Sequence, residues 1–367
     1  MRWLLVVLST LALTGCTGPA AGPQRPRAEA TAPAYPVTRV PRDLGTQPVQ
    51  AVAGLPRSLP VASAALPSAL DDPPGRARLA YHPPEWWGDA TGWASETVLL
   101  LGVDGRWRRL ALADLGRPEA DWPGVDTYGA GALSPDGRWW AGKSRAGVLL
   151  VDLGTGRHQL VGLATDWVAQ VRWLPDSSGL VAAHGRGNRS GLRTAHVSLP
   201  DLQVRAAPYE VWSTGFEPDG TPVTLRRTGG GSYDLVETPG PGAVVGGSVE
   251  LPLPGRLHRA LAPIPTEGRY AVLTQHRSTR PVDLVVLDSA TLEVQQVLRF
   301  GQRRVKLWYV WWLDADRLLL QTRRDLVLWD LRDGSVRRVA DGPEPNGEPW
   351  WAWTVDVATG VGGPLAG

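Results

Sequence analysis

Cysteine is almost absent from this chain: Cys16 is the single cysteine among 367 residues. An intramolecular disulfide therefore cannot form, and a cysteine-ligated zinc site or a thiol nucleophile elsewhere in the chain is excluded. Lysine and methionine are also rare, whereas arginine, alanine, glycine and proline are abundant. We interpret this bias as that of a GC-rich coding sequence, so it carries little information about function.

Signatures of catalytic and metal sites are missing as well. The sequence contains no G-x-S-x-G nucleophile elbow, no H-E-x-x-H zinc helix and no D-x-[DN]-x-[DN]-G calcium loop. Its six histidines show no spacing typical of metal ligands, and a formal charge of +2 gives no strong overall preference for nucleic acid. We therefore expect no cofactor, no resident metal and no nucleic-acid partner.

One nucleotide-binding pattern does match. Residues 137–144 read G-R-W-W-A-G-K-S, which fits the P-loop pattern G-x4-G-K-S. A P-loop requires a strand before its glycine-rich loop and a helix after its lysine, so that backbone amides can hold phosphate. Here Trp139 and Trp140 predict a strand inside the supposed loop, and Ala146-Gly147 leads into another strand. We therefore reject nucleotide binding.

The N-terminus combines a basic residue with a short apolar run. Arg2 precedes the apolar residues 3–13, a run about half as long as the ~20 residues that a membrane-spanning helix needs. It ends in Leu13-Thr14-Gly15-Cys16, and the arrangement resembles a bacterial lipoprotein signal. This resemblance implies a signal peptide over residues 1–15, a lipidated Cys16 and a location on the extracytoplasmic face of the cell membrane. The alternative is an ordinary secretory peptide with a coincidental cysteine.

The next segment is poor in large apolar residues. Residues 16–54 are rich in proline, alanine and threonine, and such a composition buries too little surface to offset its ordering entropy. Prolines also favour extended conformations. We expect a tether over residues 16–54 that holds a folded body, residues 55–367, away from the membrane.

A recurrent turn organises the rest of the chain. Residues 134–137, Ser-Pro-Asp-Gly, predict the end of one strand, a tight turn and the start of another. Similar acidic turns recur around four further residues: Asp176, Asp219, Glu267 and Asp314. The five acidic residues are 40 to 48 residues apart, which matches the ~40–50 residue period of four-stranded propeller blades.

A second signature follows these turns, an apolar strand that ends in aspartate before a short turn. It occurs at Asp152, Asp288, Asp330 and Asp356. In the clearest unit, the two signatures predict strands over residues 129–133, 138–142, 148–152 and 157–161. Together they resemble the bacterial β-propellers with WD40-like or TolB-like repeats, and Trp329-Asp330 reproduces the WD dipeptide. The resemblance covers residues 55–367 and implies an all-β fold, a single propeller of four-stranded antiparallel blades.

The N-terminal unit of the repeat lacks a clear inner strand. It has predicted strands at residues 78–81, 97–101 and 107–112, while residues 350–357 form a spare strand at the other end of the sequence. We expect this spare strand to close the ring against the N-terminal unit, which removes the exposed edges that favour aggregation. We predict six blades; a seventh would require that the termini build an additional composite blade.

Eighteen tryptophans are unusual, and several are adjacent in sequence. Neighbouring residues in a strand point to opposite faces, so each adjacent pair should reach both flanking blades and fill the wedges between them. The pairs within the repeat are Trp139-Trp140 and Trp311-Trp312. By contrast, Trp86, Trp87 and Trp93 occupy a loop rich in proline and glycine, where they could stack on a sugar or a partner protein. The alternative is that they cap the mouth of the channel.

Charge is distributed unevenly within the repeat. We call the four strands of a blade A to D, from the inner to the outer edge. In a propeller, the A–B and C–D turns lie on one face and the B–C and D–A loops on the other. The turns are acidic, and the B–C loops of blades two to six carry Lys143 and Arg145; Arg186, Arg189 and Arg193; Arg226 and Arg227; Arg277 and Arg280; Arg323 and Arg324. Our candidate ligand-binding residues are Arg186, Arg189, Arg226, Arg227, Arg277 and Arg280, together with Trp86, Trp87 and Trp93. A basic face would attract an anionic partner. The alternative is that turn formation alone places aspartate on the opposite face, so that this face is basic without having a ligand.

Propellers host enzymes, binders and scaffolds, so the fold does not name the function. We favour a membrane-anchored, non-enzymatic binding or scaffold module for a protein or an anionic cell-envelope ligand. The alternative is a cell-envelope enzyme of lyase or glycosidase type with its site in the channel, and a structural subunit of a lipoprotein complex remains a third reading. Histidine, aspartate or arginine side chains that converge on the inner strands would favour the enzyme hypothesis. An apolar lining of the channel would favour the binding module.

Overall fold

Short strands joined by tight turns make up nearly all of the regular structure. The computed structural model describes residues 35–60, 65–83, 97–115, 131–165, 167–185, 191–229, 232–240, 242–251, 258–260, 262–276, 282–300, 309–322, 324–342 and 353–360, together with Leu307. Residues Tyr35–Gly367 form one compact unit. In its described ranges the only helices are the short 3-10 turns η1 (Leu44–Thr46) and η2 (Leu112–Leu115), and neither is long and apolar enough to cross a bilayer.

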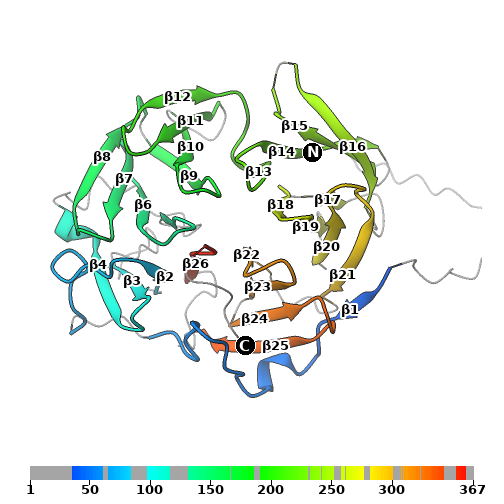
Figure 1. The fold of residues 1–367 in the computed structure, drawn as a ribbon, viewed down its shortest axis with the longest axis horizontal. Helices are drawn as coiled ribbons and strands as arrows, with labels where there is room; N and C mark the ends of the chain where they lie inside the picture. Colours follow the sequence, from blue (N-terminus) through cyan, green and yellow to red (C-terminus); the bar gives the residue numbers. More distant parts are fainter. Residues whose placement is uncertain are drawn as a thin grey trace, which may run out of the picture. The chain divides into compact units, whose positions relative to one another are not determined.

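Six antiparallel sheets, counted over the described ranges, stand around a ring as the blades of a β-propeller (Figure 1). From its inner to its outer edge, blade 1 contains β26 (Thr354–Val357), β2 (Ala77–His82), β3 (Thr97–Gly102) and β4 (Trp107–Ala111). Blade 2 contains β5 (Gly131–Leu133), β6 (Trp139–Lys143), β7 (Gly147–Asp152) and β8 (His158–Gly162). Blade 3 contains β9 (Trp167–Trp173), β10 (Gly179–Gly185), β11 (Arg193–Ser198) and β12 (Val204–Ala207).

The other three blades follow the same order. Blade 4 contains β13 (Thr214–Phe216), β14 (Pro222–Gly229), β15 (Ser232–Glu237) and β16 (Val244–Glu250). Blade 5 contains β17 (His258–Ala260) and β18 (Ile264–Thr266), which both pair with β19 (Arg269–His276), then β20 (Val282–Asp288), β21 (Val294–Arg299) and β1 (Val37–Arg39). Blade 6 contains β22 (Tyr309–Trp312), β23 (Arg317–Gln321), β24 (Asp325–Asp330) and β25 (Val336–Asp341). The prediction of six four-stranded blades is confirmed.

The C-terminal strand closes the ring. β26 pairs antiparallel with β2, in a register that runs from Leu79 opposite Val357 to His82 opposite Thr354. Blade 1 is therefore composite, with its inner strand from the end of the chain and its other three strands from the beginning. This closure was predicted from the spare strand, and it pairs the inner edge of β2.

The acidic residues of the repeat close their own turns. Asp136, Asp176 and Asp314 each accept a hydrogen bond from the backbone N–H two residues later, at 3.1, 2.9 and 2.9 Å. Asp152 and Asp330 do the same at the C–D turns, at 2.8 and 3.0 Å. Such Asx turns explain why aspartate recurs at these positions. The recurring aspartates by which the repeat was recognised are therefore explained by the turns that they stabilise.

Adjacent tryptophans fill the wedges on both sides of their blade. Trp140 is fully buried with Leu100 between blades 1 and 2, whereas Trp139 packs against the cluster between blades 2 and 3. In the same way, Trp312 packs in the cluster between blades 5 and 6, and Trp311 packs against the cluster between blades 6 and 1. The predicted role of the paired tryptophans is confirmed, and the alternation of side chains along a strand is its physical reason.

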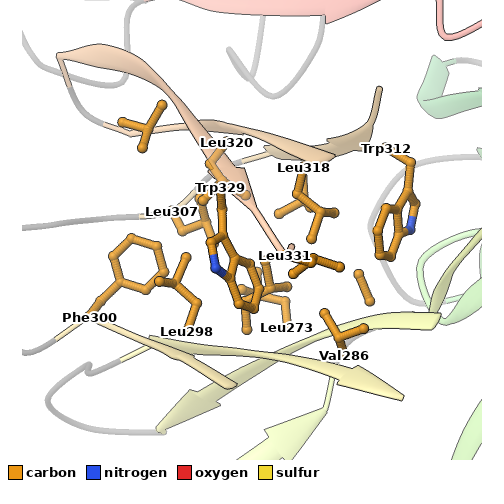
Figure 2. Close-up of a cluster of buried hydrophobic side chains, with 14 of the residues drawn as sticks. Leu273, Val286, Leu298, Phe300, Leu307, Trp312, Leu318, Leu320, Trp329 and Leu331 are labelled. Atoms are coloured by element: carbon orange, nitrogen blue, oxygen red, sulfur yellow. The ribbon is translucent and has the colours of Figure 1, made fainter. Parts of the chain in front are cut away.

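Blades are also joined by hydrogen bonds from tryptophan. The indole N–H of Trp173 donates to the carbonyl of Ala132 in the preceding blade at 2.9 Å, and that of Trp312 donates to Ile264 at 2.8 Å. Figure 2 shows the apolar cluster beneath the second of these contacts, where Trp329 lies among leucines of blades 5 and 6. Trp173 and Trp312 thus bury their apolar rings without leaving the indole N–H unpaired.

The segment that precedes blade 1 runs along the outer strands. β1 pairs in parallel with β21 of blade 5, with Val37 opposite Val297. Further on, the backbone N–H of Gln50 donates to blade 6 at 2.8 Å, and that of Ala69 donates to blade 1 at 2.7 Å. We call residues 35–60 and 65–70 the outer strap.

The outer strap changes the expected domain boundary. We had expected a tether up to residue 54, but the compact unit begins at Tyr35. The physical reason is that Leu44 is buried and that Tyr35, Val37 and Val52 pack on apolar clusters, while backbone groups between the prolines satisfy the free outer edges of the sheets.

Candidate functional site

Most of the residues that we singled out lie outside the described part of the chain. These are Cys16, Trp86, Trp87, Trp93, Arg186, Arg189, Arg277 and Arg280. Arg226 and Arg227 are described, and both are exposed near the end of β14 at its hairpin with β15. The B–C end of blade 4 is therefore the described part of the predicted arginine site.

Arg226 is held in an ion pair. Its guanidinium donates to Asp234 at 3.0 Å, and the other carboxylate oxygen of Asp234 accepts the hydroxyl of Ser248 at 2.7 Å. The hydrogen bond from Ser248, and then the contact with Arg226, lower the pKa of Asp234. The charge of Arg226 is thus partly offset within its own blade.

The other described B–C ends also carry arginine. Arg145 on blade 2, Arg193 on blade 3 and Arg324 on blade 6 are exposed. Lys143 differs, because it is buried at the end of β6 and does not add to the charge of the face. Five exposed arginines on four blades therefore remain on this face within the described ranges.

On the opposite face, the acidic residues are used within the fold. Asp330 accepts from Arg332 at 2.8 Å, and Arg269 reaches from blade 5 to Asp316 of blade 6 at 2.7 Å. Together with the Asx turns, these contacts offset part of the negative charge of the turns. The acidic character of this face is accounted for by turn formation.

A central cavity of about 840 Å³ is lined by the inner strands of all six blades. Most of its walls are apolar: prolines and tryptophans stand beside leucines and valines. Its ionisable lining residues within the described ranges include His82, Arg172, Asp314 and Asp356. Two of these, Arg172 and Asp356, lie on inner strands.

Asp356 joins three blades at the point of closure. From β26, its carboxylate accepts the backbone N–H of Leu133 in blade 2 and, at 3.1 Å, the indole N–H of Trp311 in blade 6. It also accepts the N–H of Val357 at 3.0 Å. Burial raises the pKa of Asp356 to about 6, although these hydrogen bonds act in the opposite direction.

We had grouped Asp356 with the aspartates of the acidic turn face, and this was wrong. Its sequence context resembles the end of a third strand, but the strand is the inner strand of blade 1. The carboxylate consequently lies at the cavity wall instead of a turn. Pairing between the two ends of the chain, which local sequence does not reveal, decided its position.

Arg172 is a cation of the cavity wall. From β9 of blade 3, its Nη1 donates to the carbonyl of Thr214 at the inner strand of blade 4. In the described ranges, no carboxylate lies within ion-pair distance of it, and burial alone lowers its pKa to about 10. Sequence analysis missed this residue, because the register of β9 that turns it inward is not visible in the composition.

His82 also lines the cavity, as a neutral and buried imidazole. It is buried next to Trp140, and neither ring nitrogen has a hydrogen-bond partner among the described residues. Burial, and then the positive charge of Lys143, lower its pKa to about 3. The imidazole is therefore neutral at physiological pH.

The cavity combines the two linings that we contrasted, apolar walls and charged side chains on inner strands. Its walls are mainly apolar, and Arg172 and Asp356 each engage backbone groups of a neighbouring blade. The described part of the chain contains no cluster of three or more histidine, cysteine, aspartate or glutamate side chains arranged to hold a metal. The P-loop-like residues form strand β6, with strand β7 after the lysine.

No family model matches the chain, and no curated protein matches it. Among solved structures, it is similar to TolB from Acinetobacter baumannii, with 16% identity and a TM-score of 0.42 over 75% of this chain and 67% of that chain. It is also similar to a putative TolB from Agrobacterium tumefaciens, with 14% identity and a TM-score of 0.42 over 72% and 89% of the two chains. A prolyl endopeptidase gives 15% identity and a TM-score of 0.42, with this chain spanning 45% of its length. Similarity at this level carries no argument about function, and the architecture rests on the sheets themselves: the chain is a six-bladed β-propeller in its described ranges.

Proposed function

We propose that this propeller is a lipid-anchored binding module on the extracytoplasmic face of a bacterial cell membrane. Its partner is an anionic component of the cell envelope, either a polymer or the acidic surface of a protein. Binding takes place on the face formed by the B–C ends of the blades, which we call the basic face.

The observation that supports this proposal is that the two faces differ in how their charged side chains are used. Arg145, Arg193, Arg226, Arg227 and Arg324 are exposed at B–C ends, with Arg226 also paired to Asp234, whereas aspartates of the opposite face are engaged in turns and ion pairs. A local excess of one sign raises the rate of encounter with opposite charge and is screened by salt. A nearly neutral chain can therefore still attract anions to one surface.

Replacement of these five arginines by serine is expected to abolish salt-sensitive binding to anionic envelope material. Liposomes with and without phosphatidylglycerol and a teichoic-acid preparation serve as probes, in a co-sedimentation assay at low and physiological ionic strength. Surface changes of this kind usually alter stability by no more than about 0.5 kcal/mol, so the melting temperature should stay close to that of the wild type.

The matched control replaces five exposed arginines elsewhere with serine, so that the net charge changes equally. Suitable positions, at the opposite face or on an outer strand, are Arg76, Arg106, Arg157, Arg205 and Arg332. This control should retain binding. Equal loss in both variants would show that net charge alone matters, and absence of wild-type binding at low ionic strength would make the basic face a by-product of the repeat.

The proposed anchor is tested separately. Substitution Cys16→Ala removes the sulfur to which a diacylglycerol would be joined, so the protein should remain unprocessed or be released from the membrane. Stable attachment of a soluble domain needs two acyl chains, and the expected change is from membrane to soluble fraction. Palmitate labelling and membrane fractionation measure it; a variant that is still labelled and processed would contradict the proposal.

A further inference from the structure

The central cavity holds a cation whose donors are mostly unused. A guanidinium carries five N–H groups, and the hydrogen bond of Arg172 in the described structure goes to the carbonyl of Thr214. Carboxylates of the described residues lie beyond ion-pair range of it. Arg172 is half-buried at the cavity wall, so its remaining N–H groups have the capacity to bind an anion that the cavity admits.

Other walls of the same cavity are suited to an apolar group. Tyr309 and Trp311 lie two residues apart on β22 and stack, with ring centroids 5.7 Å apart and planes at 24°. Trp212, which also lines the cavity, is 47% exposed, unusual for so large an apolar side chain. Aromatic surfaces of this kind bury apolar ligand groups.

The charge of the cavity wall restricts the kind of anion. Arg172 supplies one positive charge, and Asp356 on the same lining supplies a negative charge when ionised, while the charge of Asp314 is paired with Arg317 at 2.6 Å. A dianion such as a phosphate monoester would meet repulsion that a single carboxylate largely avoids, and the guanidinium fork matches a carboxylate in a bidentate arrangement. We propose that the central cavity binds a ligand with a single carboxylate next to an apolar group, and that Arg172 is its anchor.

Such a carboxylate has two sources, a small free acid or the C-terminus of a peptide. The probes are therefore N-acetyl-leucine and acetyl-Ala-Ala-Leu, each compared with its C-terminal amide by isothermal titration calorimetry on the whole protein. Both acids, or the peptide alone, should bind saturably, and the amides at least about tenfold more weakly, since a charged hydrogen bond is lost. Tighter binding of the peptide identifies a chain terminus as the source, and equal binding identifies a small acid.

Three variants assign the effect to one residue. Arg172→Gln should lower the affinity for the acids about tenfold or more and remove the preference over the amides. Arg172→Lys keeps the charge without the fork, so it should bind with intermediate affinity; it also serves if the glutamine variant does not fold. Arg205→Gln, an exposed position on the outer strand of the same blade, is the control and should bind like the wild type.

Two results would overturn the proposal. One is a wild-type protein that binds the acids no better than the amides, and the other is an Arg172→Gln or Arg172→Lys variant that binds the acids as tightly as the wild type. The site is separate from the basic face, so the five-arginine serine variant should retain carboxylate binding. Failure of one proposal thus leaves the other standing.

Discussion

Deletion of residues 348–367 is expected to abolish cooperative unfolding. The deletion removes β26, which pairs with β2 and contributes the buried side chains of Trp353, Val355 and Val357. Each such side chain contributes about 1.5–3 kcal/mol through burial, and their sum approaches the net stability of about 5–15 kcal/mol that typical domains have. The inner edge of β2 would also be left unpaired, which favours aggregation.

Calorimetry and light scattering test this expectation. The wild type should melt in one cooperative transition, whereas the truncated protein should show a broad transition or aggregate. A matched control deletes only residues 361–367, which lie beyond β26. A 348–367 deletion that melts like the wild type would mean that the C-terminal strand is an appendage and that the ring is held by its other interfaces.

Stability is expected to fall as the pH rises through the pKa of Asp356. Burial raises this pKa from its ordinary value of 3.8 to about 6, so the folded chain holds the proton more tightly than the unfolded chain. The resulting stabilisation is fully present below the unfolded pKa and is lost as the pH rises through 6. A difference of about two units corresponds to about 3 kcal/mol, with the carboxylate remaining bound to Leu133 and Trp311 above that pH.

Substitution Asp356→Asn isolates this effect, because the amide does not ionise. The free energy of unfolding of both proteins is measured by urea titration between about pH 4 and about pH 8, and that of the wild type should fall relative to that of the variant as the pH rises. Other titrating groups are shared and cancel in the difference. The asparagine cannot accept the Leu133 N–H as well as the carboxylate does, so the slope of the difference is the readout. A difference that is independent of pH would contradict the assignment.

Local chemistry explains why the fold was readable from the sequence. Asp136 and Asp314 close turns by contacts two residues away, and paired tryptophans such as Trp139-Trp140 follow from the alternation of a strand. Such short-range rules repeat in every blade, so each repetition reinforces the prediction. Blade number followed from the spacing of these turns.

Pairing between distant parts of the chain explains why the positions of some residues could not be predicted from the sequence. The outer strap has a composition typical of a disordered segment, yet β1 pairs with β21, some 260 residues later in the sequence. Asp356 was assigned to a turn because its neighbours resemble one, and Arg172 carries no local signal at all. Lys143 was placed on the basic face by its loop position, but it is the last residue of β6 and is buried.

The sequence by itself determined the elements of this protein: the acidic turns, the four-stranded unit, the six repeats and the strand that completes the ring. These depend on contacts between residues close in the chain or on a period that can be counted. Tertiary structure decided which sheet edges the outer strap follows, which arginines remain on the basic face, and that Arg172 and Asp356 line the central cavity. Those outcomes depend on which strand edges pair and in which register, and a shift of one residue would turn every side chain of a strand to its other face.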